Sequence, residues 1–446
     1  MDNKTDVITP RQRDDARRLA LEFFRAIHDG DSLDDCINRL SSQPKFVPTG
    51  LVRHLLMGAL RQQGQLERVL KRHLTKPLHK TPNDIRDILL LSAYEVIFTT
   101  APKASVAHAW VEIAKNSAKL KRISNLLNAI LRKLVEESEA SLPSKIYNLP
   151  FWLRKRLIAD WGQKRMEQVA EVISAPPPID LYIRQGTNID VPDGIWFGNK
   201  HWRCEDAGLD IRQIEGFDDG KFWVQNIAAS LPLELVELLG RDVKSALDLC
   251  AAPGGKTMQM VDMGWDVTAV DVSSRRLQRL SENLVRCHMD ESVELVRSDV
   301  RRYPAEKTFD VVLLDAPCTA TGTIRRHPDL LWQKGEETLD ELTLLQAEML
   351  KHARHFVKKD GLLVYAVCSL LKDEGERQIE QFLSQFPQFC MESIVLPEWL
   401  NTHVEILNTG SLRILPDHLM EKGGMDGFYM AILRHGGHQH RHSTKN

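Results

Sequence analysis

The amino-acid sequence predicts a multidomain fold: an all-α bundle, then a small α+β connector, then an α/β domain built on a mostly parallel sheet. Apolar residues recur at helical spacing over residues 10–140, whereas from Phe222 onward short apolar stretches alternate with segments long enough for helices. The length of 446 residues also predicts more than one domain, because a single hydrophobic core rarely grows beyond about 250–300 residues. The predicted boundaries are 1–141, 142–220 and 221–435, followed by a disordered tail at 436–446.

The helical pattern is clearest between residues 81 and 134. Thr81 followed by Pro82 predicts a helix start, with Thr81 as the N-cap and Pro82 in the first helical position. A later apolar stripe marks the buried face of another helix: Ile123, Leu126, Leu127, Ile130, Leu131 and Leu134. A further helix is predicted at 151–174, and short strands and turns at 179–220.

The C-terminal half alternates predicted strands with predicted helices. The strand candidates are 245–250, 266–272, 293–299, 309–314, 361–369 and 427–434. Helices are predicted between them, for example at 275–287 and 346–358. Such alternation is typical of a parallel sheet with helices on both faces, and chemistry in these sheets gathers beyond the carboxyl ends of the strands.

The composition is that of a globular protein, with 43% hydrophobic and 27% charged residues and no apolar run long enough to cross a bilayer. The N-terminal residues show no apolar stretch of the kind that a secretory signal needs. The seven cysteines are widely scattered, odd in number and without metal-ligand spacing. We therefore expect no metal, no membrane partner and a cytoplasmic location, where thiols stay reduced.

Charge is unevenly distributed, although the formal net charge is only −2. Residues 51–133 hold 15 Lys and Arg against 5 Asp and Glu, so the rest of the chain is acidic. A basic module of this kind is typical of a domain that binds a polyanion. An ordinary solvated helical face is the alternative, and charge alone does not separate the two.

A turn with two glycines follows the first strand of the predicted α/β sheet, at residues 248–257. Its spacing fits neither a Walker loop nor a full dinucleotide fingerprint, but its backbone N–H groups can meet a carboxylate or a ribose at close range. Asp271 ends the next strand, about 20 residues further on, where a ribose-binding acid is expected. Asp299 ends the third strand and is placed to reach an adenine edge. Each acid alone can be a helix N-cap, but their succession indicates an adenosine-containing ligand.

Two cysteines end two later strands of the same sheet. Cys318 follows the strand at 309–314, and Cys368 follows the strand that begins at Gly361. Because the carboxyl ends of parallel strands share one edge, both thiols and the glycine turn are expected in one crevice. This arrangement suits covalent attack on an electrophile beside a nucleotide-like cofactor. A thiol that only packs is the alternative, and we adopt it for Cys36, Cys204, Cys287 and Cys390.

Five segments together resemble one enzyme family. They are LDLCAAPGGKT (247–257), LDAPC (314–318), Cys368-Ser369 with acidic residues downstream, GTIRRHPD (322–329) and DGFY (426–429). In these motifs the chain resembles the RNA 5-methylcytosine methyltransferases, specifically the RsmB (Fmu/Sun) group, which methylates small-subunit ribosomal RNA. The N-terminal helices resemble the antitermination factor NusB, as they do in that group, so the resemblance covers nearly the whole chain.

The resemblance implies a NusB-like RNA-binding bundle and a Rossmann-like methyltransferase domain, with S-adenosylmethionine as cofactor and 16S ribosomal RNA as substrate. We expect the protein to be a monomer. The resemblance also implies Cys368 as the nucleophile and Cys318 as a helper in product release. The cofactor-binding residues it implies are Cys250, Ala251, Ala252, Pro253, Gly254, Gly255, Lys256, Asp271, Arg276, Asp299 and Asp315. Among these, the turn would hold the methionine part, Asp271 the ribose and Asp299 the adenine.

The chemistry of cytosine methylation needs such residue types. Cytosine C5 is a poor nucleophile until a thiolate adds to C6 and makes C5 enamine-like. A free thiol has a pKa of about 8.5, so Cys368 needs a local field to ionise it. Asp315, next to the base, can hold a proton at N3 and stabilise the adduct. A base then removes the C5 hydrogen, and the sulfur leaves by elimination.

Three positions depart from the family's usual pattern. Val367 stands where a threonine usually precedes the nucleophile, and Asn226 replaces a usual aspartate. Gly375 ends a segment, Lys-Asp-Glu-Gly, that is usually Pro-Glu-Glu-Asn. The alternatives left open are an RNA-binding assembly factor with weak methyltransferase activity and a methyltransferase of another RNA, such as transfer RNA. A DNA cytosine methyltransferase is disfavoured, because Cys-Ser after the later strand is not part of that pattern.

Two basic segments are candidates for contact with the RNA backbone. Arg325, Arg326 and His327 follow the Pro-Cys loop, which favours contact with RNA phosphates. Trp152 with Arg154, Lys155 and Arg156 is either an exposed helix end or a second contact, and the sequence leaves both interpretations open.

Overall fold

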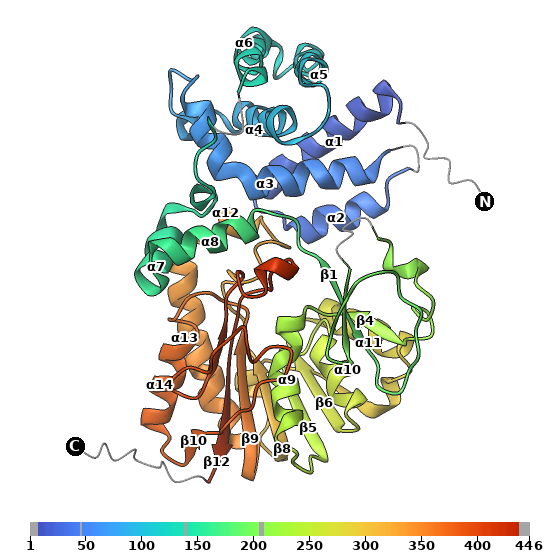
Figure 1. The fold of residues 1–446 in the computed structure, drawn as a ribbon, viewed down its shortest axis with the longest axis vertical. Coiled ribbons are helices and arrows are strands. Elements are labelled where there is room, and N and C mark those ends of the chain that lie inside the picture. Colours follow the sequence, from blue (N-terminus) through green and yellow to red (C-terminus); the bar gives the residue numbers. More distant parts are fainter. Residues whose placement is uncertain (1–7, 45–46, 138–140, 205–208, 437–446) are drawn as a thin grey trace. The chain divides into compact units, whose positions relative to one another are not determined.

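The structure is a computed structural model that describes residues 8–44, 47–137, 141–204 and 209–436 (Figure 1). The chain forms two compact units. The helical unit consists of Met1–Ala175 with Ile324–Gly335, and the sheet unit consists of Pro176–Thr323 with Glu336–Asn446. The four-part division predicted from the sequence stays a prediction, and all of its tail except Gly436 lies outside the described residues.

The helical unit confirms the predicted all-α architecture of the N-terminal residues. Its helices are α1 (Pro10–His28), α2 (Leu33–Ser41), α3 (Thr49–Lys71), α4 (Asn83–Phe98), α5 (Lys103–Lys115), α6 (Ser124–Val135), α7 (Phe151–Trp161), α8 (Gln163–Ile173) and α12 (Leu330–Gln333). The single helix predicted at 151–174 is therefore two helices, since Gly162 between them has a φ of 81°. The prediction of Thr81 as N-cap is wrong, because α4 starts one residue later and the Thr81 hydroxyl bonds to the Pro77 carbonyl.

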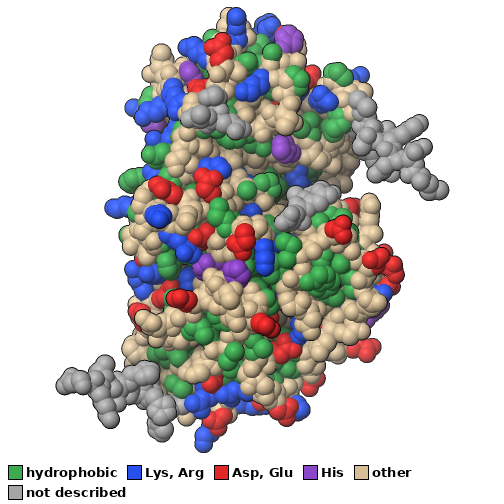
Figure 2. All heavy atoms as spheres, in the orientation of Figure 1, with side chains coloured by type: hydrophobic (Ala, Val, Ile, Leu, Met, Phe, Trp, Pro, Cys, Tyr) green, Lys and Arg blue, Asp and Glu red, His purple; other side chains and the backbone are tan. Residues whose placement is uncertain are grey.

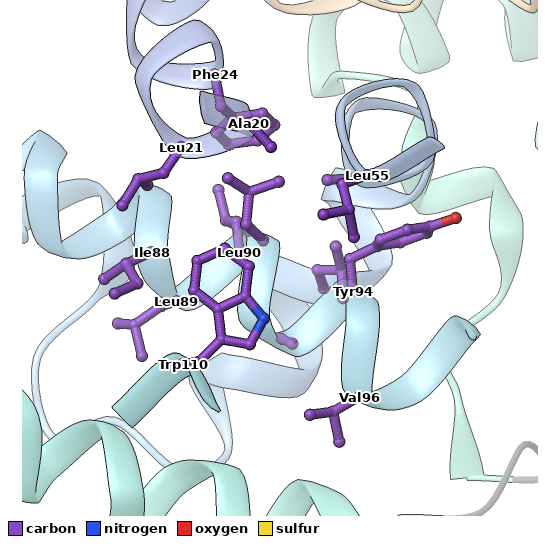
Figure 3. Close-up of a cluster of buried hydrophobic side chains, with 14 of the residues drawn as sticks. Ala20, Leu21, Phe24, Leu55, Ile88, Leu89, Leu90, Tyr94, Val96 and Trp110 are labelled. Carbon is purple, nitrogen blue, oxygen red and sulfur yellow. The ribbon is translucent and has the colours of Figure 1, made fainter. Parts of the chain in front are cut away.

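The apolar core of the helical unit contains a buried ion pair between Arg17 and Glu95. Trp110 packs among leucines of α4 and against α1 (Figure 3). The Trp110 Nε1 atom donates to Glu95 Oε2 at 2.7 Å, and Arg17 Nη2 donates to Glu95 Oε1 at 2.7 Å. Because Arg17 and the indole satisfy this carboxylate, Glu95 avoids the several kcal/mol that an unpaired buried charge costs.

A short segment from the second half of the sequence belongs to the helical unit. Asp329 Oδ2 accepts the backbone N–H of Leu33 at 3.0 Å, and Trp332 Nε1 donates to the Leu60 carbonyl at 3.0 Å. Arg61, buried in α3, donates through Nε to the Arg325 carbonyl at 2.8 Å. Residues 324–335 thus complete the helical unit, although they directly follow the Pro-Cys loop in sequence.

This packing overturns one prediction about RNA contact. Arg325 is only 3% exposed, and its Nε donates to the Ala175 carbonyl at 3.3 Å. A side chain with no exposed face has nowhere to meet a phosphate, so the prediction is wrong for Arg325. His327 faces Asp34 across 3.5 Å. The contact proposed for Arg326 stays a prediction.

The sheet unit contains an eight-stranded sheet in the order β10-β12-β9-β8-β5-β6-β7, with β11 paired to β12. The strands are β5 (Ser245–Leu249), β6 (Asp266–Asp271), β7 (Val293–Arg297), β8 (Phe309–Asp315), β9 (Val357–Val367), β10 (Phe389–Met391), β11 (Leu412–Ile414) and β12 (Phe428–His435). Strands β5 to β9 pair in parallel, and β12 is antiparallel to β9. All six strand candidates are confirmed, whereas β10 and β11 were not predicted.

Helices cover both faces of this sheet, as the alternation predicted (Figure 1). One face packs against α9 (Ile227–Leu238), α10 (Gly255–Asp262) and α11 (Ser274–Arg286), and the other against α13 (Glu336–Ala353) and α14 (Glu376–Gln385). The helix predicted to reach residue 358 ends at Ala353, because β9 begins at Val357. No helix in the described ranges has the length and hydropathy needed to cross a membrane.

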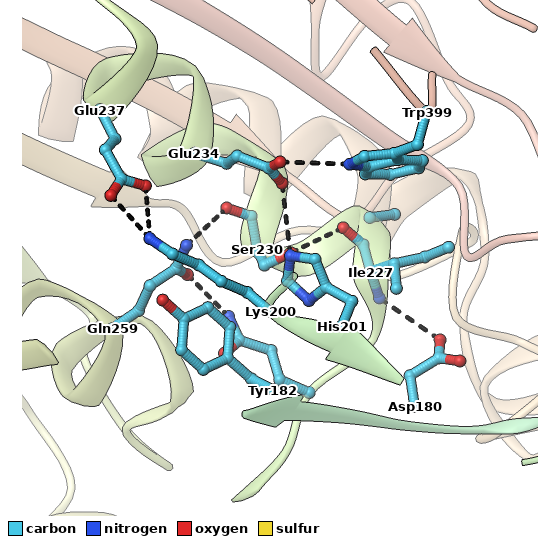
Figure 4. Close-up of polar contacts among 12 residues, drawn as sticks. Asp180, Tyr182, Lys200, His201, Ile227, Ser230, Glu234, Glu237, Gln259 and Trp399 are labelled. Atoms are coloured by element: carbon cyan, nitrogen blue, oxygen red, sulfur yellow. Dashed lines mark hydrogen bonds and ion pairs between the residues drawn. The ribbon is translucent and has the colours of Figure 1, made fainter. Parts of the chain in front are cut away.

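A four-stranded antiparallel sheet, β2-β3-β1-β4, matches the short strands predicted around residue 200. It consists of β1 (Ile179–Ile183), β2 (Ile195–Phe197), β3 (His201–Cys204) and β4 (Phe222–Val224). Polar contacts tie it to α9 (Figure 4): Lys200 Nζ donates to Glu237 at 2.6 Å, and His201 Nε2 lies 3.3 Å from Glu234 Oε2. The small sheet thereby packs against α9, the helix that precedes β5, and holds it in place.

Candidate active site

The carboxyl ends of β5, β6, β8 and β9 bring the predicted catalytic and cofactor residues to one edge of the large sheet. The glycine turn after β5 leads directly into α10. Its tight path depends on Gly254, whose φ is 109°, and a Cβ there would lie 2.2 Å from the Leu280 Cδ1 atom. The first N–H groups of α10 have no partners within the helix, so this turn is suited to an anionic group such as a carboxylate.

Asp271 ends β6 beside this turn, and its carboxylate is held on several sides. Its Oδ2 accepts the Ala252 N–H at 3.3 Å. Its Oδ1 accepts the Ser273 N–H and the Arg276 guanidinium, both at 2.9 Å. The side chain is 1% exposed. An acid fixed in this way is suited to receive the hydroxyl groups of a ribose, and Arg276 acts through Asp271 by orienting it.

Asp248 lies near the carboxyl end of β5, just before the turn, and its carboxylate tests whether a cofactor fits there. Its Oδ2 accepts the Thr257 hydroxyl at 2.6 Å, whereas its Oδ1 is buried without a partner among the described residues. Burial raises the pKa of Asp248 to about 7, and the neighbouring Asp315 adds to the effect. A buried acceptor left unsatisfied is costly, so a hydrogen-bond donor on a bound ligand would suit this position. The residues present therefore fit a cofactor with an amino group and a ribose.

Asp299 follows β7 and caps the short 3-10 helix η7 (Val300–Arg302). Its Oδ1 accepts the Arg301 N–H at 2.9 Å, and its Oδ2 accepts the Arg301 guanidinium at 2.7 Å. These bonds hold the pKa of Asp299 below its usual value and keep it ionised. Its predicted contact with adenine stays a prediction, because Arg301 already engages both of its oxygen atoms.

Lys256 and Asp315 form a partly buried ion pair between the cofactor turn and the end of β8. The Lys256 Nζ atom lies 2.7 Å from Asp315 Oδ2 and 5.1 Å from the centre of the Phe428 ring. Burial alone would lower the pKa of Lys256, but the negative charge of Asp315 outweighs it and raises the pKa. Cys368 also interacts electrostatically with the Lys256 ammonium.

The two cysteines meet at the ends of β8 and β9, as predicted. Their Sγ atoms lie 3.5 Å apart. The hydrogen bond to Cys368 and burial raise the pKa of the Cys318 thiol well above its usual value. Cys318 therefore holds its proton at neutral pH.

Glu374 joins the two cysteine-bearing loops, and the sequence reasoning did not single it out. Its Oε1 accepts the Thr319 N–H at 2.8 Å and the Gln346 amide at 3.0 Å. Its Oε2 accepts the hydroxyls of Thr319 and Ser369. Thr319 and Ser369 are the residues that follow Cys318 and Cys368, so one fully buried carboxylate bonds to both cysteine-bearing loops. The only signal in the sequence was the acidic segment downstream of Cys368.

The three departures from the family's pattern fit their surroundings. Val367 is buried in the sheet core, where a methyl replaces a hydroxyl of similar size. Asn226 donates through Nδ2 to Asp180 at 2.7 Å, a bond that an ionised aspartate cannot make. Gly375 leaves room for Arg413, because a Cβ there would lie 2.4 Å from the Arg413 Nη2 atom. Arg413 in turn bonds to the Ser369 carbonyl, next to the nucleophile.

A parallel sheet of this order, with a glycine turn after its first strand and a fixed acid after its second, defines the class of S-adenosylmethionine-dependent methyltransferases. The model of the family described as 16S rRNA methyltransferase RsmB/F matches residues 236–434, and the NusB family matches residues 14–136. The chain belongs to the RsmB/F family, it is an RNA methyltransferase, and S-adenosylmethionine is its cofactor.

Similar proteins span nearly the whole chain. The Ribosomal RNA small subunit methyltransferase B of Salmonella paratyphi B is 30% identical over 418 residues, which cover 87% of this chain and 94% of that protein. The protein of the same name from Klebsiella pneumoniae is 30% identical over 403 residues, covering 83% and 90%.

Two solved structures share the fold. The crystal structure of PH0851 has a TM-score of 0.72 at 21% identity and covers 95% of this chain and 99% of that one. The structure of NSun6 from Pyrococcus horikoshii with SFG has a TM-score of 0.52 at 17% identity and covers 65% of this chain and 98% of that one.

Proposed function

We propose that this enzyme forms 5-methylcytosine in 16S ribosomal RNA through a covalent bond between Cys368 and C6 of the target cytosine. The observation that carries the proposal is the pair of thiols 3.5 Å apart beside the Lys256–Asp315 ion pair. A single thiol would serve for attack alone. A second, protonated thiol at this distance suits a reaction in which the first must also leave.

The cofactor site follows from the same edge of the sheet. The turn at 250–256 binds the methionine part, Asp271 receives the ribose hydroxyls, and Asp299 lies at the adenine end. Arg276 holds Asp271 in place through the bond at 2.9 Å. The cofactor, when bound, supplies an electrophilic methyl group.

The residues of the chain divide the remaining work. The Cys368 thiolate forms a bond to C6, and the electron pair of the C5–C6 double bond becomes available at C5. The proton that Cys368 gives up is taken by N3, and the Asp315 carboxylate accepts a hydrogen bond from that N3–H and stabilises the adduct. After C5 is methylated, a base takes the C5 proton, the double bond re-forms and the Cys368–C6 bond breaks. Cys318, whose Sγ atom lies 3.5 Å from that of Cys368, assists that release.

Methyl transfer from tritiated S-adenosylmethionine to protein-free 16S ribosomal RNA, followed by bisulfite mapping, tests the proposal. We expect one cytosine to become resistant to bisulfite with the native enzyme and to stay reactive with Cys368→Ala. Cys390→Ala, which changes a buried thiol on β10, is the matched control and should keep full activity. Incorporation at a base other than cytosine would overturn the proposal.

The two alternatives give different results in the same assay. Incorporation into transfer RNA but not into 16S RNA would make transfer RNA the substrate. No incorporation into total RNA would favour an RNA-binding assembly factor. The proposed setting remains the cytoplasm, where ribosomal RNA and seven free thiols both belong.

A further inference from the structure

The helical unit contains a cavity of about 510 Å³ that the proposed chemistry does not use. It lies between the end of α3, the 3-10 helix η1 (Leu78–Lys80), the 3-10 helix η4 (Lys145–Asn148) and the start of α7. We call it the cationic cavity. The residues that define it are Arg68, Lys71, His79, Arg154, Tyr147 and Phe151.

The cations of this cavity are not neutralised by nearby acids. The Arg68 guanidinium stacks on the Tyr147 ring at 3.4 Å from its centre, and Arg154 lies 4.8 Å from the same centre. Neither guanidinium forms an ion pair with a carboxylate in the described part of the chain, and the same holds for Lys71. Burial and the positive charge of Arg68 both lower the pKa of Arg154. Two cations held together in this way gain if an anion enters between them.

The acid closest to these cations does not balance them. Glu67 lines the cavity, but it is turned into the unit and accepts a hydrogen bond from Gln63 Nε2 at 3.1 Å. Burial raises the pKa of Glu67. Arg86 has its own partner, Asp87, at 3.3 Å. The anion that the cavity lacks must therefore come from a ligand.

One wall of the cavity is an exposed aromatic ring. Phe151, the first residue of α7, is 73% exposed, which is unusual for so large an apolar side chain. The Arg154 guanidinium lies 5.8 Å from the centre of its ring. Around it, Lys and Arg side chains gather along the left edge of the view, over the end of α3 and over α7 (Figure 2). Cations beside a free aromatic face are the combination that binds single-stranded nucleic acid, in which a base stacks and its phosphate is paired.

We propose that the cationic cavity binds one nucleotide of a single-stranded segment of the RNA substrate. The phosphate lies between Arg68 and Arg154, whose planar guanidinium groups match its oxygens, and Lys71 adds a third positive charge. The base stacks on Phe151. The volume of the cavity is within the range of about 300–1,000 Å³ typical of sites for small ligands, and a nucleotide is of that size. That the ligand is RNA rests on the proposed function.

The test measures RNA binding without turnover, so that its result does not depend on which base is methylated. The probes are protein-free 16S ribosomal RNA and a labelled single-stranded RNA of mixed sequence, each titrated with the full-length protein. Phe151→Ala removes an exposed ring and leaves the fold intact. We expect it to weaken binding of both probes about tenfold, without changing the dependence on salt.

The charge variant is Arg68→Gln combined with Arg154→Gln. It should weaken binding by about tenfold or more and reduce the slope of log K against log salt by about 1, since one phosphate contact is lost. The matched control is Arg132→Gln with Lys133→Gln, which removes two basic residues of α6 outside the cavity. That control should bind as the native protein does.

Three results would overturn the proposal. Native affinity in both Phe151→Ala and the double arginine variant would show that RNA does not use the cavity. If the α6 control lost as much RNA affinity as the double arginine variant, the loss would be explained by net charge alone. Displacement of RNA by adenosine monophosphate or inorganic phosphate at micromolar concentration would make a free nucleotide or phosphate the ligand. None of these results bears on whether the active site forms 5-methylcytosine, which is measured separately as methyl incorporation.

Discussion

The sulfur atoms of Cys318 and Cys368 lie 3.5 Å apart, although 50 residues separate them in the sequence. If Cys368 attacks and Cys318 assists release, removing the helper should trap the intermediate. We expect Cys318→Ala to accumulate a covalent enzyme–RNA complex that survives denaturing gel electrophoresis. Cys368→Ala and the double variant should form none. A gel without a trapped complex for Cys318→Ala would contradict these roles.

The Lys256 ammonium interacts electrostatically with Cys368, and a positive charge near a thiol raises its reactivity. Lys256→Met removes that charge, and the rate at which iodoacetamide alkylates Cys368 at pH 7 should fall about tenfold. Site-resolved mass spectrometry measures that rate. Lys358→Met, which breaks an ion pair with Asp310 at 2.8 Å elsewhere in the unit, serves as control. An unchanged rate in Lys256→Met would show that another group stabilises the thiolate.

Glu374 should act as a positioning residue for both thiols. Glu374→Ala leaves the Thr319 N–H and two hydroxyls without their acceptor, which should cost about 2–3 kcal/mol of unfolding free energy. We also expect kcat of the folded enzyme to fall by about a hundredfold, since small misplacements of reacting groups have effects of that size. Affinity for S-adenosylhomocysteine should hardly change.

The conservative variant separates positioning from folding. Glu374→Gln keeps one acceptor oxygen, and the hydroxyls of Thr319 and Ser369 can rotate to accept from its amide. It should restore most of the stability and part of kcat. If Glu374→Ala loses stability but its folded fraction keeps native kcat, Glu374 is structural only.

Asp248 should make the folded enzyme less stable as pH rises, which is the opposite of what most carboxylates do. Its folded pKa of about 7 is above the unfolded value of about 3.9, so the folded state binds the extra proton between these limits. Its contribution is complete below about pH 4 and is lost as pH rises to about 7, by about 4 kcal/mol. Asp248→Asn, neutral throughout, should therefore gain stability relative to the native protein as pH rises, measured by denaturant unfolding of the cofactor-free enzyme.

Asp310 should have the opposite effect on the pH dependence of stability. Burial would raise the pKa of Asp310, but hydrogen bonds from Lys358 and Ser245 outweigh it and lower the pKa. Asp310→Asn should therefore lose stability relative to the native protein above about pH 4, and the difference should shrink as the solution becomes more acidic. Parallel pH profiles for the two variants would contradict the assignment for Asp248.

Gly375 and Arg413 should be energetically coupled. Introducing the family's usual residue, Gly375→Asn, places a Cβ 2.4 Å from the Arg413 guanidinium and 2.7 Å from the Tyr429 ring. We expect a loss of about 1–3 kcal/mol, as for other overpacked cores. Arg413→Ala in the same chain should recover part of it. Strictly additive losses in the double variant would show that the two side chains do not compete for this space.

Local patterns were enough to predict the sheet and the composition of the site. Each strand candidate is a short apolar stretch followed by a turn, and parallel strands end at one edge, so the meeting of Cys318, Cys368 and Asp271 could be predicted. The missed strands β10 and β11 have three residues each, too few to show a period. The helix predicted to reach residue 358 ran too far, because its apolar residues continue without a break into β9.

The sequence by itself determined the order of strands and helices, the residue types at the strand ends and, through its motifs, the family. Periodicity and motif spacing act over a few residues, and they can therefore be recognised without a structure. Only the tertiary structure decided that Glu374 links the two cysteine loops, that Arg413 fills the space beside Gly375 and that residues 324–335 complete the helical unit. Those contacts join residues brought together by packing, and no local pattern records which distant side chain will occupy a given space.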